Sequence, residues 1–159
     1  MNTSRLIAFA VQPLAIGTLL ALGVLAGAAH ATTYNPPIRL AASGVEYMSG
    51  GIGADEEKLM ETVAPRWPAT FEFAVKDHQK ADFAANVRVS VRDLASGATV
   101  LDGVQASGPF MLARLEPGRY EVDATLGGRT LQRTVTLNGT GPVHELFLWP
   151  AGTDMASNG

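Results

Sequence analysis

The side chains most able to do chemistry in this chain are histidines that lie near carboxylates. Asp77, His78 and Asp82 are close together in the sequence and could hold a metal ion. His144 and Glu145 are adjacent, and adjacent side chains on an extended strand point to opposite faces, so these two cannot share one ion there. We therefore expect no catalytic residue, no metal site and no cofactor. The alternative is a small metal-dependent hydrolase that uses Asp77, His78 and Asp82.

Two other kinds of catalytic centre find little support. The chain contains no cysteine, which excludes thiol catalysis, CxxC redox chemistry and thiolate zinc sites. Ser90 and Ser107 have no His-Asp arrangement beside them in the sequence. We interpret Ser90 as a polar outward position on a strand and Ser107 as part of a turn.

Basic and aromatic side chains form a second group of candidates, for binding rather than catalysis. Arg88, Arg92 and Arg133 lie on predicted strands and could grip the carboxylates, sulfates or phosphates of charged sugars. Trp67 and Trp149 could stack on sugar rings. The alternative is a solvated arginine face balanced by acids, with tryptophans that cover the ends of a core. These five are the candidate ligand-binding residues.

The first 31 residues have the features of a signal peptide. One arginine and no acid lie in residues 1–5, and residues 6–29 are almost entirely apolar. Ala29 and Ala31 occupy the two positions that a signal peptidase reads, and polar residues follow from Thr32. We predict cleavage near Ala31/Thr32 and a periplasmic or secreted protein. The alternative is that residues 6–29 are retained as a membrane anchor, because about 20 apolar residues can span a bilayer.

Composition restricts the partners of the exported chain. Removing residues 1–31 leaves 128 residues with 11 basic and 15 acidic side chains, a net charge of −4. This balance argues against nucleic acid, whose phosphates require a basic face. Because no second long apolar run is present, we expect no stable membrane anchor after cleavage.

Residues 32–69 are predicted to form an N-terminal arm, one or two short strands (38–41 and 45–49) and a helix over residues 53–64. The helix prediction rests on an acidic first turn, an apolar stripe at helical spacing and a proline that stops it. The acids of the first turn are Asp55, Glu56 and Glu57, the apolar stripe consists of Leu59, Met60 and Val63, and the proline is Pro65.

From residue 70 onward, apolar and polar residues alternate in short runs, which predicts β structure. The turns between the runs delimit a domain over residues 70–149, with a flexible tail at 150–159. Seven short strands separated by turns are typical of a β-sandwich. The predicted strands are 70–75, 87–92, 99–104, 110–115, 119–126, 129–137 and 144–148.

The strongest local signal is a hairpin closed by Gly127-Gly128. With a two-residue loop there, the residue numbers of any two positions that pair across the hairpin add up to 255. The apolar residues of one strand then lie opposite those of the other, with Arg133 the one exception. The predicted pairs are Tyr120 with Val135, Val122 with Arg133, and Ala124 with Leu131.

Several motifs resemble the carboxypeptidase regulatory-like domain. They are Leu101-Asp-Gly103, Gly108-Pro-Phe110, Leu115-Glu-Pro-Gly-Arg-Tyr-Glu-Val-Asp-Ala124, Gly128, and Arg133-Thr-Val-Thr136. In the most specific run, Pro117-Gly118 makes a turn and Tyr120 and Val122 are buried. The resemblance covers roughly residues 70–148 and implies a seven-stranded transthyretin-like (prealbumin-like) sandwich. The preceding segment, residues 49–57, is similar to the N-terminal part of small exported bacterial proteins that carry this domain.

The resemblance also implies a function without chemistry. In that family the sandwich accompanies a separate zinc peptidase domain, for which this chain has neither the length nor the HxxE motif. We expect a non-catalytic periplasmic binding or accessory module that recognises an envelope protein or polysaccharide. Recognition would use a sheet edge, loops or an arginine-bearing face. A further alternative is a purely structural accessory to another envelope protein.

Overall fold

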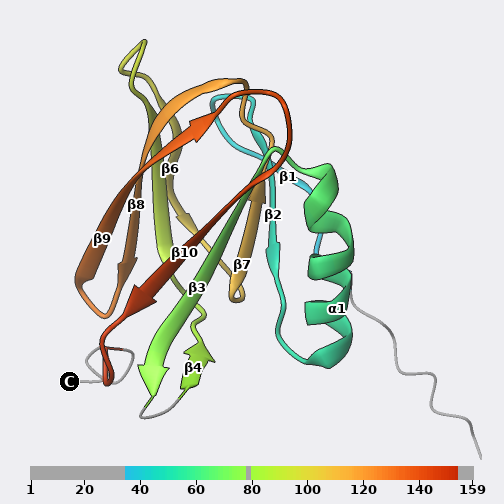
Figure 1. Ribbon diagram of the computed structural model, residues 1–159, viewed down its shortest axis with the longest axis vertical. Coiled ribbons are helices and arrows are strands. Elements are labelled where there is room, and N and C mark those ends of the chain that lie inside the picture. Colours follow the sequence, from blue (N-terminus) through green and yellow to red (C-terminus); the bar gives the residue numbers. More distant parts are fainter. Residues whose placement is uncertain (1–34, 78–79, 154–159) are drawn as a thin grey trace, which may run out of the picture. The chain divides into compact units, whose positions relative to one another are not determined.

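The computed structural model describes residues 35–77 and 80–153 (Figure 1). The predicted signal peptide with its cleavage residues Ala29 and Ala31 lies outside the described residues. So do His78 and residues 154–159 of the predicted tail. In the two described ranges, no helix is long and apolar enough to cross a membrane.

The strands form two sheets (Figure 1). Sheet A has the order β1-β2-β7-β3-β10, and β4 also pairs with β3. Its strands are β1 (Arg39–Leu40), β2 (Glu46–Gly50), β3 (Ala69–Asp77), β4 (Lys80–Phe83), β7 (Phe110–Ala113) and β10 (Val143–Trp149). Sheet B has the order β6-β5-β8-β9. Its strands are β5 (Arg88–Asp93), β6 (Thr99–Gln105), β8 (Gly118–Leu126) and β9 (Arg129–Leu137).

The main core lies between the two sheets and follows the alternation in the sequence. Successive side chains of a strand point to opposite faces, so every second residue can be buried. In β8 the even-numbered residues from 120 to 126 are buried and the odd-numbered ones are more exposed. The largest fully buried core side chains from the two sheets are Phe71, Phe73, Phe147 and Trp149 of sheet A, with Leu101 and Val122 of sheet B.

The predicted hairpin is confirmed in both its turn and its register. Gly127 and Gly128 have φ of 53° and 74°, the left-handed values that a tight type I′ hairpin turn requires. Tyr120 pairs with Val135, and Val122 pairs with Arg133. Ala124 pairs with Leu131 as predicted. The length of the turn therefore determines which side chains face each other.

Helix α1 (Ala54–Val63) covers part of the outer face of sheet A. Its one buried side chain, Met60, packs in a second apolar cluster with Met48, Trp67, Phe110 and Leu112. The acidic first turn is also present: Glu56 Oε1 accepts a hydrogen bond from the Gly51 N–H at 2.9 Å. The helix ends before Pro65, which lies in the 3₁₀ turn η1 (Ala64–Arg66). Figure 1 shows α1 alongside β2.

Over residues 35–77 and 80–153 the fold is mainly β with one short helix, as predicted, but it has ten strands rather than seven. All seven predicted strands are present, and both short strands predicted before the helix are confirmed as β1 and β2. Strand β4 lies between the predicted strands 70–75 and 87–92, where no strand was predicted. It forms because β3 extends to Asp77, so its last residues offer backbone partners: Ala74 pairs with Phe83 and Asp77 with Lys80.

Candidate binding site: a pocket between three loops

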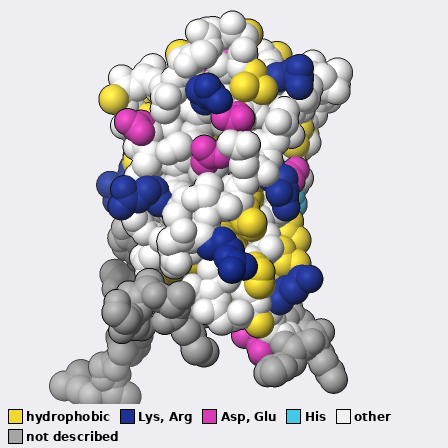
Figure 2. Space-filling view, turned by 90° about the vertical axis from the view of Figure 1, so that its left-hand side faces the viewer, with side chains coloured by type: hydrophobic (Ala, Val, Ile, Leu, Met, Phe, Trp, Pro, Cys, Tyr) yellow, Lys and Arg dark blue, Asp and Glu magenta, His cyan; other side chains and the backbone are white. Residues whose placement is uncertain are grey.

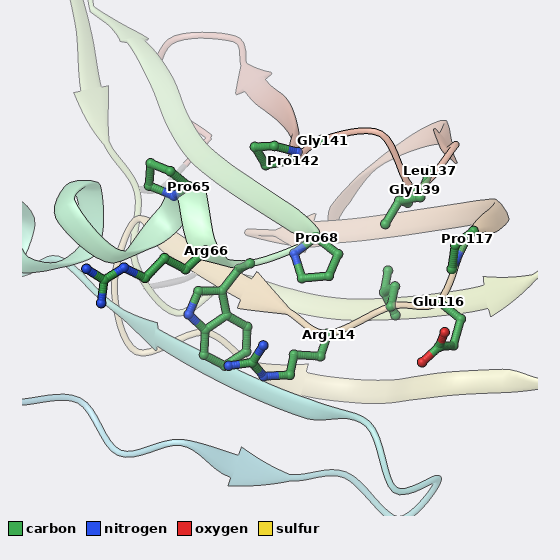
Figure 3. Close-up of a pocket in the computed structure, with 12 residues that line it drawn as sticks. Pro65, Arg66, Pro68, Arg114, Glu116, Pro117, Leu137, Gly139, Gly141 and Pro142 are labelled. Carbon is green, nitrogen blue, oxygen red and sulfur yellow. The ribbon is translucent and has the colours of Figure 1, made fainter.

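One cavity among the described residues lies where three connections meet (Figure 3). They are the segment that joins α1 to β3, the β7–β8 connection and the β9–β10 connection. The cavity has a volume of about 440 Å³, and we call it the loop pocket. Prolines line it from all three connections: Pro65 and Pro68, Pro117, and Pro142. Proline fixes φ, so these walls have little conformational freedom.

Hydrogen bonds hold two of the connections in place. The Tyr120 hydroxyl donates to the Glu116 carbonyl at 2.9 Å, a contact of the tyrosine-corner type that fixes the β7–β8 connection. Asn138 Oδ1 accepts from the Thr140 N–H at 3.1 Å and from its hydroxyl at 2.8 Å. Gly139 has φ of 75°, a left-handed value that glycine adopts readily in a tight turn.

The same two connections also touch each other. A Cβ on Gly139 would lie 3.2 Å from Cγ of Pro117, which leaves little space between the turn and the β7–β8 connection. The third connection is joined to β10 by a hydrogen bond of 2.9 Å from the Val143 N–H to the Pro68 carbonyl. The pocket is therefore largely formed before any ligand arrives.

Arg114 gives the loop pocket a positive charge beside an aromatic ring. Its guanidinium carbon lies 4.4 Å from the centroid of the Trp67 ring, a cation–π contact. Its Nε also lies 2.8 Å from Glu46 Oε2, yet 47 % of the side chain is exposed. Trp67 itself is only 4 % exposed. A ligand would therefore contact the arginine before the aromatic ring.

Arg66 adds a second positive charge. It is exposed, and it has no ion-pair partner within residues 35–77 and 80–153. Figure 3 shows Arg66 and Arg114 on the side of the pocket away from Pro117, with the Arg66 side chain extending outward from the other lining residues. Guanidinium groups donate charge-assisted hydrogen bonds to carboxylates, and such bonds are among the strongest in proteins.

The structure does not bring the three candidate arginines onto one binding face. Arg88 and Arg92 lie on exposed positions of β5, and Arg92 forms an ion pair with Glu121. The hydrogen bond that Arg92 donates to Glu121, and then the charge of Glu121, raise the pKa of the Arg92 guanidinium. Arg133 lies on β9 and pairs with Glu145 of sheet A. Figure 2 views the side that carries β8 and β9, where basic side chains are spread singly with acidic ones between them.

Neither candidate tryptophan presents a free ring. Trp149 is fully buried, and its Nε1–H donates to the Arg129 carbonyl at 2.9 Å. The centroid of its ring lies 6.3 Å from the centroid of the Phe73 ring. The interpretation of Trp149 as a sugar-stacking residue was therefore wrong. Trp67 is likewise buried, under Arg114. Both tryptophans cover parts of a core, which was the alternative interpretation.

The proposed metal ligands are only partly described. Asp77 ends β3, and Asp82 is exposed on β4 opposite Val75. Among the residues whose positions the structure gives, no three histidine, aspartate or glutamate side chains are grouped closely enough to hold a metal ion. His144 forms an ion pair with Glu72, with 2.8 Å between Nε2 and Oε2. It points away from Glu145, as the alternation along the strand requires.

Sequence reasoning did not single out the loop pocket. Its residues come from three segments far apart in the chain, and no spacing rule connects Arg66 with Arg114. The available signal was local: Arg66 and Trp67 stand between two prolines, a rigid exposed segment with a cation. Comparison of the chain with family models, with curated proteins and with solved structures found no match.

Proposed function

We propose that this chain is a non-catalytic module that binds a carboxylate-bearing unit of an envelope polysaccharide in the loop pocket. The observation that carries the proposal is the position of Arg66 and Arg114 at one end of a preformed pocket, with Arg66 unpaired within the described chain. Two guanidinium groups match the charge and the hydrogen-bonding geometry of a carboxylate.

The size of the pocket favours a sugar unit over a protein surface. A volume of about 440 Å³ is within the roughly 300–1,000 Å³ of small-ligand sites. A stable protein partner would instead need a contact area of about 800 Å² on each side. Because the proline-lined walls are already fixed, binding requires little ordering of the chain, which lowers its entropic cost.

We also propose that the two sheets form a transthyretin-like sandwich and that the protein is exported to the periplasm. Strands β3 and β5 to β10 occupy the part of the chain that carries the resemblance. Strands β3 and β5 belong to different sheets, whereas the first two strands of an immunoglobulin sandwich belong to the same one. The apolar segment and the Ala29–Ala31 site support export.

The test of binding is isothermal titration calorimetry on protein purified in the form that cells produce. The ligand is trigalacturonate, and the control ligand is neutral maltotriose. We expect trigalacturonate alone to bind. Arg66→Gln should weaken it by about tenfold, because a hydrogen bond to a charged group is lost. Arg119→Gln is the matched control: Arg119 is exposed on β8, and no described residue forms an ion pair with it. Equal binding of both sugars, or an Arg66 variant that binds as tightly as the parent, would contradict the proposal.

A further inference from the structure

A second groove lies on the outer face of sheet A, beside the C-terminal end of α1. It has a volume of about 320 Å³, and we call it the sheet groove. Glu61 and Pro65 line one side, and Glu72, Phe83 and His144 line the other. Pro65 also lines the loop pocket, so the two sites are neighbours. The proposed function above does not use the sheet groove.

Large apolar side chains are exposed on this face. Phe83 is 51 % exposed, and its ring centroid lies 5.6 Å from that of Phe110. Leu146 on β10 is 44 % exposed and pairs with Glu72, so it lies on the same strip of the sheet. The buried helix residue Met60 packs with residues of β2 and β7 rather than with β10. Apolar side chains exposed beside a groove are a feature of interaction sites on folded proteins.

The charge of the sheet groove determines what kind of partner fits. Glu61 and Glu72 lie at its rim, and among its described lining residues there is no lysine or arginine. The Glu72–His144 ion pair, 2.8 Å between Nε2 and Oε2, holds the Glu72 carboxylate in place at the groove. An apolar floor with acidic rims complements a segment in which apolar and basic side chains are mixed. Lysine stems can lie on apolar surface while their ammonium groups reach the carboxylates.

From these observations we infer that the sheet groove docks an extended segment of a partner protein that carries alternating leucine-like and lysine-like side chains. An extended segment fits because the face is itself a strand surface: His144 and Leu146 are two residues apart on β10, and the same spacing places alternate side chains of a strand on one face. The sheet groove shares Pro65 and Pro142 with the loop pocket, but Arg66 and Arg114 do not line it.

The test uses a fluorescein-labelled nonapeptide of alternating lysine and leucine, with binding followed by fluorescence anisotropy. Two control peptides replace lysine by glutamate, or leucine by serine. We expect only the lysine–leucine peptide to bind, and its affinity to fall as salt is raised, since exposed charges are screened. Phe83→Ser should weaken binding by about tenfold or more, because aromatic residues in such sites dominate the binding energy. Glu61→Gln should weaken it by about threefold to fivefold.

Matched variants separate this groove from general attraction to an acidic protein. Leu94→Ser removes another exposed apolar side chain, and Asp102→Asn removes an exposed carboxylate on β6; both should bind the peptide like the parent. Val143→Ser alters a second residue that lines the groove and should also weaken binding. Arg66→Gln should leave peptide binding unchanged, so the two proposals fail separately. The inference is overturned if the parent does not bind the peptide, if the glutamate peptide binds equally, or if Leu94→Ser loses as much affinity as Phe83→Ser.

Discussion

Arg133 on β9 and Glu145 on β10 join the edge strands of the two sheets through an ion pair, with 3.5 Å between Nε and Oε1. Both residues occupy positions on the inner faces of their sheets, because each pairs with a buried residue of the neighbouring strand. Arg133 pairs with Val122, and Glu145 pairs with Phe71. Charges that point inward on edge strands discourage pairing with other chains. The place of Arg133 at the open side of the sandwich therefore explains why a charged residue lies opposite Val122.

The first prediction concerns this edge. Replacing Arg133 by leucine makes the inner row of β9 apolar from residue 131 to residue 137 and leaves Glu145 without this partner, so we expect the variant to associate with itself. Light scattering after size-exclusion chromatography should show species larger than the parent that increase with protein concentration. Arg119→Leu, an outward position on β8, is the control. Elution identical to that of the parent would show that Arg133 does not protect the edge.

The second prediction concerns the tyrosine corner. Tyr120→Phe keeps the buried ring but loses the hydrogen bond to the Glu116 carbonyl, so the free energy of unfolding should fall by about 1 kcal/mol. Tyr120→Ala also removes the ring from the core and should cost on the order of 3–5 kcal/mol. Urea denaturation measures both. If the phenylalanine variant is as stable as the parent, the corner contributes nothing to the fold.

The third prediction concerns the hairpin turn. Gly128 has φ of 74°, so Gly128→Val should cost about 1–2 kcal/mol or more through backbone strain, although no atom lies within 4 Å of the added Cβ. Gly141→Val is the matched control, because Gly141 also faces open space and has no left-handed φ. Thermal unfolding should show a lower Tm for the first variant only. Equal melting temperatures would refute the strained turn.

The fourth prediction concerns acid stability. The Ala95 N–H, and then the Ser96 hydroxyl, stabilise the ionised carboxylate of Asp93 and lower its pKa below the ordinary 3.8. A lowered pKa means that the folded state binds the proton less readily than the unfolded state. The stabilisation is therefore complete well above pH 3.8 and is lost as the pH falls through the folded pKa. Asp93→Asn should flatten the fall in stability below about pH 4; a curve parallel to that of the parent would exclude this contribution.

Much of the fold could be predicted because one physical rule, the alternation of side chains along a strand, determines it. The rule placed the seven main strands, and the two-residue turn at Gly127 and Gly128 determined the register of the hairpin. Strand β4 could not be predicted, because Phe83 is the one large apolar residue in a polar segment. Its pairing depends on the extension of β3 to Asp77, which the local sequence of β4 does not determine.

The candidate site was less accessible to sequence reasoning. Alternation could have revealed the burial of Trp149, since it stands two residues after buried Phe147 on the same strand. The loop pocket gave no such signal, because loops fold together through contacts between distant residues, such as Gly139 against Pro117. Its binding chemistry becomes visible only when Arg66 and Arg114 are seen at one pocket.

The most direct test of the central claim uses the two tryptophans as internal reporters. The chain has two indole N–H groups, one from Trp67 at the loop pocket and one from Trp149 in the core. In a two-dimensional nitrogen–proton NMR spectrum, trigalacturonate should shift the Trp67 indole signal in a saturable way and leave the Trp149 signal in place. Arg66→Gln should require more ligand for the same shift. If neither indole signal moves, or if both move together, the loop pocket is not the binding site.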